Sequence, residues 1–202
     1  HFGKFASGIY ILAQLGKGAP EMLVGRARGV AEVGIFSRAG GMVELFSRLA
    51  MRPVMQVCMP YFARANRDGG SVLPAYLTSI SLLTAVGWPF LGVLAVVAFP
   101  AIRIVYGPQW LAAVPLAQVL CLACAIELLF MPSREALLAC GDARRANALQ
   151  VQIVSLQVLG LIAVFPYGLV GACWGLTAAA LGGATMSQRQ LGRRIGLRVS
   201  EL

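Results

Sequence analysis

The chain has 202 residues, of which 58% are hydrophobic and only 12% are charged, and its mean hydropathy is +0.76. Ordinary soluble domains are roughly 45–50% apolar and about 25% charged, so this composition excludes a typical water-soluble domain and predicts a protein embedded in lipid. The formal charge of +9 does not indicate nucleic-acid binding, because the basic residues flank or interrupt apolar runs and form no separate polar domain.

Three long uncharged runs predict helices that span a membrane. They contain 34 residues between Asp68 and Arg103, 23 between Arg103 and Glu127, and 43 between Arg145 and Arg189. A spanning helix needs about 20 predominantly apolar residues. The last run must hold two helices, because a single helix of that length would be about 65 Å long, twice the thickness of a bilayer core.

We therefore expect an all-α polytopic membrane protein with six transmembrane helices. In chain order these cover about residues 5–24, 33–63, 72–99, 110–131, 148–165 and 169–190. The fourth helix follows a turn at Gly107-Pro108, and the neighbouring rings of Tyr106 and Trp110 suit the headgroup layer of a membrane.

The connections between the later helices are also marked in the sequence. Residues 132–148 mix both charges and are expected to be a polar loop outside the hydrocarbon. The segment Phe165-Pro166-Tyr167-Gly168 is the expected hairpin between the last two helices, and residues 191–202 form a basic tail.

The distribution of basic residues predicts the orientation. With six crossings both ends lie on one side, and that side carries Lys4, Arg64, Arg67, Arg134, Arg144, Arg145, Arg189, Arg193, Arg194 and Arg198. The other side carries Arg26, Arg28, Arg103 and Arg38. The positive-inside rule then places both ends in the cytoplasm. Because the chain opens with HFGKFASG, we expect it to be the later part of a longer protein.

The second predicted helix carries charges that are costly inside a membrane. At about 100° per residue, Arg38, Arg48, Arg52 and Gln56 fall within about 80° of one another, with Glu44 at the border of this face. One hypothesis is that the arginines line a cationic cavity that holds an anionic group such as a phosphate. The alternative is that they extend to the interface or pair with Glu44 or a neighbouring helix.

Three further charged residues are candidates for coupling transport to a proton or cation. Lys17 and Glu21 stand four residues apart and can form an ion pair on the first helix, or a coupling site. Glu127 is the only charge in the fourth helix, where it is an interfacial carboxylate or a relay residue.

No pattern indicates catalysis, a metal site or a cofactor. Cys121 and Cys124 form a C-x-x-C, but the only histidine is His1, and the five cysteines are best read as small apolar side chains. The sequence has no P-loop and no catalytic triad. Gly171-x-x-x-Gly175 in the sixth helix predicts close helix packing rather than ligand contact.

Several of these segments resemble a known family. Gly107-Pro108-Gln109-Trp110, followed by an apolar helix with Pro115 and Gln118, is similar to the Gly-Pro-x-Trp turn of polysaccharide exporters. Similar stretches in the same order are Glu21-Met22-Leu23-Val24-Gly25-Arg26, Val33-Gly34-Ile35-Phe36-Ser37-Arg38-Ala39 and Met59-Pro60-Tyr61-Phe62-Ala63-Arg64. The chain resembles the lipid-linked oligosaccharide flippases, O-antigen flippases among them, of the multidrug/oligosaccharidyl-lipid/polysaccharide exporter superfamily.

This resemblance implies the C-terminal six-helix lobe of a twelve- or fourteen-helix flippase in the bacterial inner membrane, paired with an N-terminal lobe. Its substrate would be an undecaprenyl-pyrophosphate-linked oligosaccharide, moved outward by alternating access, with the pyrophosphate meeting the arginines of the second helix. The alternatives are a multidrug cation antiporter, which would favour an acidic, aromatic cavity, or the non-catalytic membrane half of a glycosyltransferase.

Overall fold

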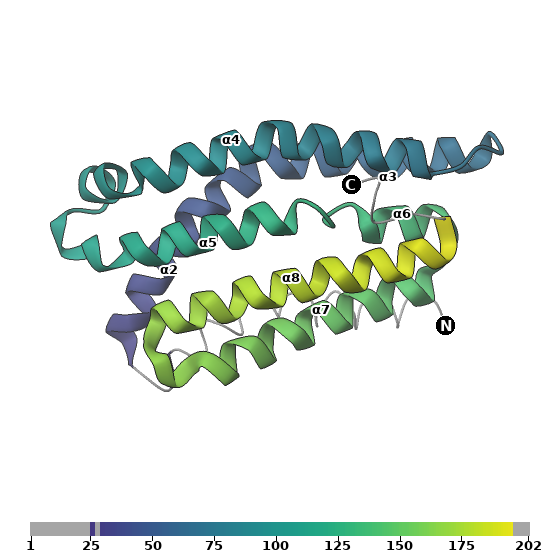
Figure 1. Cartoon of the computed structure of the whole chain (residues 1–202). Coiled ribbons are helices and arrows are strands. Elements are labelled where there is room, and N and C mark those ends of the chain that lie inside the picture. Colours follow the sequence, from purple (N-terminus) through teal and green to yellow (C-terminus); the bar gives the residue numbers. More distant parts are fainter. Residues whose placement is uncertain (1–24, 27–28, 196–202) are drawn as a thin grey trace.

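A computed structural model describes residues 25–26 and 29–195 of the chain (Figure 1). The helix predicted at residues 5–24, including the coupling candidates Lys17 and Glu21, lies outside the described residues. So do residues 196–202 of the predicted basic tail.

The described part is helical almost throughout, which confirms the all-α prediction. Its elements are α2 (Val30–Phe46), the π-helical segment η1 (Ser47–Met51), α3 (Arg52–Arg67), α4 (Leu73–Val105), the 3-10 helix η2 (Pro108–Ala113), α5 (Val114–Glu127), α6 (Ser133–Ala139), α7 (Ala143–Val164), the 3-10 turn η3 (Phe165–Tyr167) and α8 (Gly168–Ile195).

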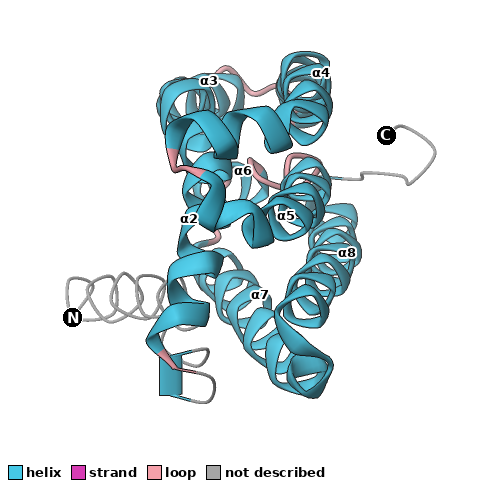
Figure 2. Cartoon of the chain, turned by 90° about the vertical axis from the view of Figure 1, so that its left-hand side faces the viewer, coloured by secondary structure: helices cyan, strands magenta, loops and turns pink. Residues whose placement is uncertain are grey.

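The long helices pack as an elongated bundle with α5 at its centre. Helices α7 and α8 lie side by side along their length, α8 also packs against α5, and α5 contacts α4 and α2. In the end-on view of Figure 2, α3 and α4 form one edge of the bundle and α7 and α8 form the opposite edge.

The bundle has two chemically different ends. The α3–α4 turn, α6, the start of α7 and the end of α8 lie at one end (Figure 1), which we call the basic end after Arg64, Arg67, Arg134, Arg144, Arg145 and Arg189. The corner between α4 and η2 and the η3 turn lie at the other, which we call the aromatic end after Tyr106, Trp110 and Tyr167. The connections with most of the arginines therefore lie together at one end of the bundle, and the two aromatic turns lie together at the other.

Four helices of the described part are long and apolar enough to cross a membrane. They are Leu73–Val105, Pro108–Glu127, Ala143–Val164 and Gly168–Gly192, which correspond to the third to sixth predicted helices. The second predicted helix is interrupted by η1 into α2 and α3, of 17 and 16 residues. The number of six crossings stays a prediction.

Two helices extend beyond the ends that the sequence predicted for them. Helix α4 continues through Pro89 and Pro100 to Val105 instead of ending near residue 99. Each proline removes only one backbone donor, and neighbouring helices in a membrane protein can compensate for that loss. Helix α8 likewise extends to Ile195, into the predicted tail.

The prediction of a simple polar loop at residues 132–148 is wrong. The short helix α6 buries Ser133, Ala136 and Leu137, and α7 already begins at Ala143. The Ser133 hydroxyl lies 2.9 Å from the Tyr76 hydroxyl in a buried hydrogen bond to α4. The apolar segment Ala136-Leu137-Leu138 lies between the charged residues of this stretch. It gives α6 an apolar face that packs against α3 and α7, which explains why a helix forms here.

Candidate functional site

The candidate arginines lie on the interrupted helix α2–η1–α3. Arg38 lies in α2, Arg48 lies inside the π-helical segment, and Arg52 is the first residue of α3. The interruption precedes Pro53, which has no backbone N–H to donate to the carbonyl four residues earlier. A π turn is one of the recognised ways in which a helix accommodates such a break, and it is frequent at functional sites.

The π segment changes how these residues are arranged around the helix axis. It adds about one residue to a turn, which rotates everything that follows by about 100° relative to a regular α-helix. The angles calculated for a regular helix therefore do not apply across η1. Gln56 is exposed on α3. The proposed binding role of the four residues stays a prediction.

Arg48 pairs with Glu44, one turn earlier. Its Nε lies 3.1 Å from Oε1 of Glu44, and the two side chains are 63% and 39% exposed. An exposed pair at this spacing contributes only about 0.3–0.5 kcal/mol, so it holds the guanidinium weakly. The pairing with Glu44, which was the alternative interpretation for Arg48, is thus present, and most of the Arg48 side chain remains exposed.

Arg38 has a different environment at the aromatic end. Its guanidinium carbon lies 5.2 Å from the ring centre of Tyr106 and 5.2 Å from that of Trp110. Gly107, with φ +95°, makes the turn that brings both rings toward α2. Gly34 leaves the room for the indole, because a Cβ there would lie 3.1 Å from the Trp110 ring.

This cation–π cluster was not anticipated from the sequence, which predicted the two rings only as interfacial anchors. The turn at Gly107-Pro108 is confirmed, but the helix that follows begins with 3-10 geometry. The signal that could have revealed the contact is Gly34 one turn before Arg38, since a glycine beside an arginine on one helix face leaves a notch that an aromatic ring can fill.

Glu127 is the one coupling candidate that the structure describes. It ends α5, and its Oε1 accepts a hydrogen bond of 3.2 Å from the Gln157 amide on α7. The carboxylate is partly buried and links two helices. Both the interfacial and the relay interpretation are compatible with this position.

The described residues contain no group of three or more His, Cys, Asp or Glu side chains that could hold a metal ion. All five cysteines are free thiols. Cys58, Cys121 and Cys173 are buried among apolar side chains, as predicted.

The sequence is similar to known proteins of polysaccharide synthesis. Residues 1–115 match the family model described as "Polysaccharide biosynthesis protein". The teichuronic acid biosynthesis protein TuaB of Bacillus subtilis (strain 168) is 30% identical over 175 residues, which cover 86% of this chain and 36% of TuaB. No solved structure matches the chain significantly. The match to the family model covers more than half of the chain, which therefore belongs to the polysaccharide biosynthesis protein family.

Proposed function

We propose that this membrane protein is a flippase that translocates an undecaprenyl-pyrophosphate-linked oligosaccharide for lipopolysaccharide or exopolysaccharide synthesis. It acts by alternating access in the bacterial inner membrane, together with an N-terminal lobe, and both ends of this chain face the cytoplasm. Membership of the polysaccharide biosynthesis family and four apolar helices of spanning length support a membrane step in glycan synthesis. The protein itself makes or breaks no bond in this proposal.

The observation that carries the proposal is the position of Arg48 and Arg52 at the π-helical segment. Arginine within a membrane helix costs roughly 2.5–3.5 kcal/mol on insertion scales and is retained mainly where it serves a binding or transport path. Here one arginine lies within the irregular turn and the next follows it directly. A guanidinium binds phosphate through two parallel hydrogen bonds, so this pair suits a pyrophosphate better than a neutral sugar.

The charge of the same helix argues against a multidrug cation antiporter. From Val30 to Arg67 the chain carries five arginines, Arg38, Arg48, Arg52, Arg64 and Arg67, against two acidic residues, Glu32 and Glu44. An organic cation would be repelled by this balance, whereas a pyrophosphate would be attracted.

The test is transbilayer movement of a lipid-linked oligosaccharide by the full-length protein in proteoliposomes, alongside surface-glycan export in cells. Arg48→Ala and Arg52→Ala should insert normally but lose movement of the lipid, and Lys at either position should restore only part of it. Arg144→Ala, at an exposed arginine on the first turn of α7, is the matched control and should behave like the parent. Full export by the double alanine variant at normal abundance would rule out this site.

A further inference from the structure

Regular helical geometry is interrupted at three places between the two ends of the bundle. The π-helical segment η1 separates α2 from α3, and a turn at residues 128–132 separates α5 from α6. In α4, Pro89 follows Gly87-Trp88 and has no N–H to donate to the carbonyl of Ala85. A π turn, a break between helices and a proline are all recognised places where a helix can bend.

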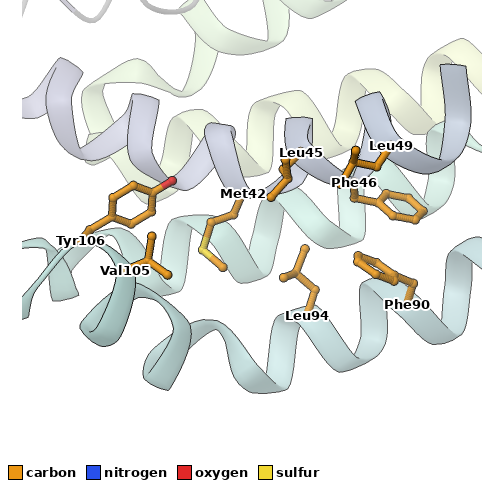
Figure 3. A pocket seen from close by; sticks show the side chains of 8 residues that line it. All are labelled: Met42, Leu45, Phe46, Leu49, Phe90, Leu94, Val105 and Tyr106. Atoms are coloured by element: carbon orange, nitrogen blue, oxygen red, sulfur yellow. The ribbon is translucent and has the colours of Figure 1, made fainter.

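The three interruptions lie in one layer across the bundle. A Cβ on Gly87 would collide with Cδ1 of Leu128 and lie 3.6 Å from the ring of Phe46. Leu128 is the first residue after α5, and Phe46 is the last residue of α2. The Phe46 ring also stacks on Phe90 of α4 with centres 4.4 Å apart (Figure 3). We call this the central layer, after the buried cluster of Phe46, Met51, Leu83, Leu91, Cys121 and Leu128.

The central layer is far from both ends of the bundle. At 1.5 Å per residue, Gly87 lies about 21 Å along α4 from Leu73 and about 27 Å before Val105. A second buried cluster, which includes Phe62 and Tyr76, lies on the basic side of the layer. A third, which includes Phe36 and Ile102, lies on its aromatic side. The layer therefore separates two cores that are built from different parts of the same chain.

On the basic side, three segments form one packed unit, which we call the basic-end unit. They are α3, residues 73–86 of α4, and α6. The hydroxyls of Tyr76 and Ser133 join α4 to α6 in the buried hydrogen bond of 2.9 Å. The Asn66 amide donates a hydrogen bond of 3.1 Å to the Ala139 carbonyl, which joins the end of α3 to α6. The apolar side chains of the unit share one cluster, to which Cys58, Phe62, Ile80, Ala136 and Leu137 contribute.

The chain enters and leaves the basic-end unit only at places that can bend. Three of these places are the interruptions in the central layer. The fourth is the turn between α6 and α7, where Gly141 has a φ of +77°. Helices α3 and α4 have few contacts with α7 and α8, which lie at the opposite edge of the bundle (Figure 2), so the unit meets them mainly through α6. The unit can therefore tilt without breaking a regular helix.

We propose that the central layer is a hinge within this bundle, about which the basic-end unit tilts as one body and opens or closes the cytoplasmic side. Hinges of this kind are a few element-terminal residues between segments that stay rigid. Arg52 is the first residue of α3 and moves with the unit, whereas Arg48 lies within the hinge itself. The link between this tilt and transport rests on the proposed function, but the hinge does not.

The expected movement is large enough to measure. A change of about 20° in the bend, the size of a proline kink, moves the far end of the unit, about 21 Å away, by about 7 Å. Double electron–electron resonance can follow it in the full-length protein in nanodiscs, with spin labels on cysteines that replace Asp68 and Arg189 in a background without native cysteines. Both positions are exposed, one at the end of α3 and the other on α8. The parent should show two distance populations about 7 Å apart.

A second label pair tests whether the unit is rigid. Tyr61 on α3 and Leu82 on α4 both lie within it and are 48% and 58% exposed. Labels at these two positions should give one narrow distance population. Two populations from this pair would show that the unit does not move as one body. A single distance from the first pair, unchanged when undecaprenyl pyrophosphate is added, would overturn the hinge.

Pro89→Ala and Pro100→Ala are matched variants that separate the hinge from the rest of α4. Both prolines are exposed within the same helix, and alanine favours a helix, so both variants should accumulate normally. Pro89→Ala gives the Ala85 carbonyl a backbone partner that the bent state loses. The ratio of the two populations should therefore change by about fivefold, the effect of one net hydrogen bond. Pro100→Ala should keep the ratio of the parent.

The two variants also separate the hinge from transport. No change in the ratio with Pro89→Ala, or an equal change with Pro100→Ala, would contradict a hinge at the central layer. A changed ratio in Pro89→Ala together with normal glycan export would leave the hinge in place and count against its link to transport alone.

Discussion

Gly160 on α7 and Gly175 on α8 face each other so closely that a Cβ on Gly160 would lie 2.6 Å from the carbonyl oxygen of Gly175. A Cβ on Gly175 would in turn meet the carbonyl oxygen of Gly160. The sequence predicted that Gly171-x-x-x-Gly175 packs closely against a neighbouring helix, and this contact confirms it for Gly175. Close backbone approach replaces the hydrophobic driving force that helices lack in lipid.

Alanine at either glycine should push α7 and α8 apart. We expect Gly160→Ala and Gly175→Ala each to destabilise the protein by about 1–3 kcal/mol, since the added Cβ would clash with backbone atoms of the facing helix, which cannot rotate away. Gly92→Ala in α4 is the matched control, because no atom lies within 4 Å of its added Cβ. The measurement is the apparent melting temperature of detergent-purified protein, and an unchanged Gly175→Ala would contradict the packing argument.

The topology can be tested at three positions in a background without the native cysteines. Figure 1 places the ends of α3 and α8 at the basic end, and the Asn66 amide donates a hydrogen bond of 3.1 Å to the Ala139 carbonyl there. Cysteines replacing Asn66 and Gly192 should react with an impermeant maleimide only after the cells are permeabilised. A cysteine replacing Tyr167, which is 80% exposed at the aromatic end, should react in intact cells. Labelling of positions 66 and 192 from opposite faces would refute the six-helix arrangement.

Glu135 on α6 should make stability depend on pH. Burial raises the pKa of its carboxyl above the ordinary value of 4.5. This outweighs the opposing effects of a hydrogen bond to its own backbone and of Arg134, whose Nη1 lies 3.7 Å from Oε1. The folded protein then binds more protons than the unfolded chain between the two pKa values, so stability is lost as the pH rises through that window. The contribution of Glu135 to the stability of the parent should therefore fall as the pH is raised above about 4.5.

Glu135→Gln keeps the shape of the side chain and removes its charge. It should flatten this pH dependence and melt at a higher temperature than the parent at neutral pH. An identical slope in Glu135→Gln and the parent would show that this carboxyl does not contribute.

Much of the fold was predictable because it depends on local sequence. Uncharged runs identified α4, α5, α7 and α8, and Gly107-Pro108 and the Phe165–Tyr167 segment marked the turns at the aromatic end. These features follow from the cost of charge in lipid and from the conformations of glycine and proline.

The candidate site was less predictable because it depends on departures from regular geometry and on contacts between distant segments. The π turn before Pro53 rotates the following residues around the helix axis, and this rotation cannot be calculated from the 3.6-residue period of a regular α-helix. The contact of Arg38 with Tyr106 and Trp110 joins residues about 70 positions apart. Helix α6 is buried by contacts with α3, α7 and Tyr76 of α4, which are also distant in the sequence.

The role of Arg48 can be separated from that of its ion pair by exchanging the two charges. If the arginine serves only to pair with Glu44 across 3.1 Å, then Glu44→Arg combined with Arg48→Glu restores the pair and should restore surface-glycan export. If Arg48 binds the pyrophosphate, the exchange places a carboxylate within the π segment, where it repels the substrate. Export should then stay at least about tenfold below the parent, the loss expected when a charge-assisted hydrogen bond is removed.

Glu44→Gln alone controls for the other interactions of that carboxylate, and immunoblotting of membranes controls for abundance. Because the pair is exposed and contributes little to stability, we expect both variants to accumulate normally and only the exchanged one to lose export.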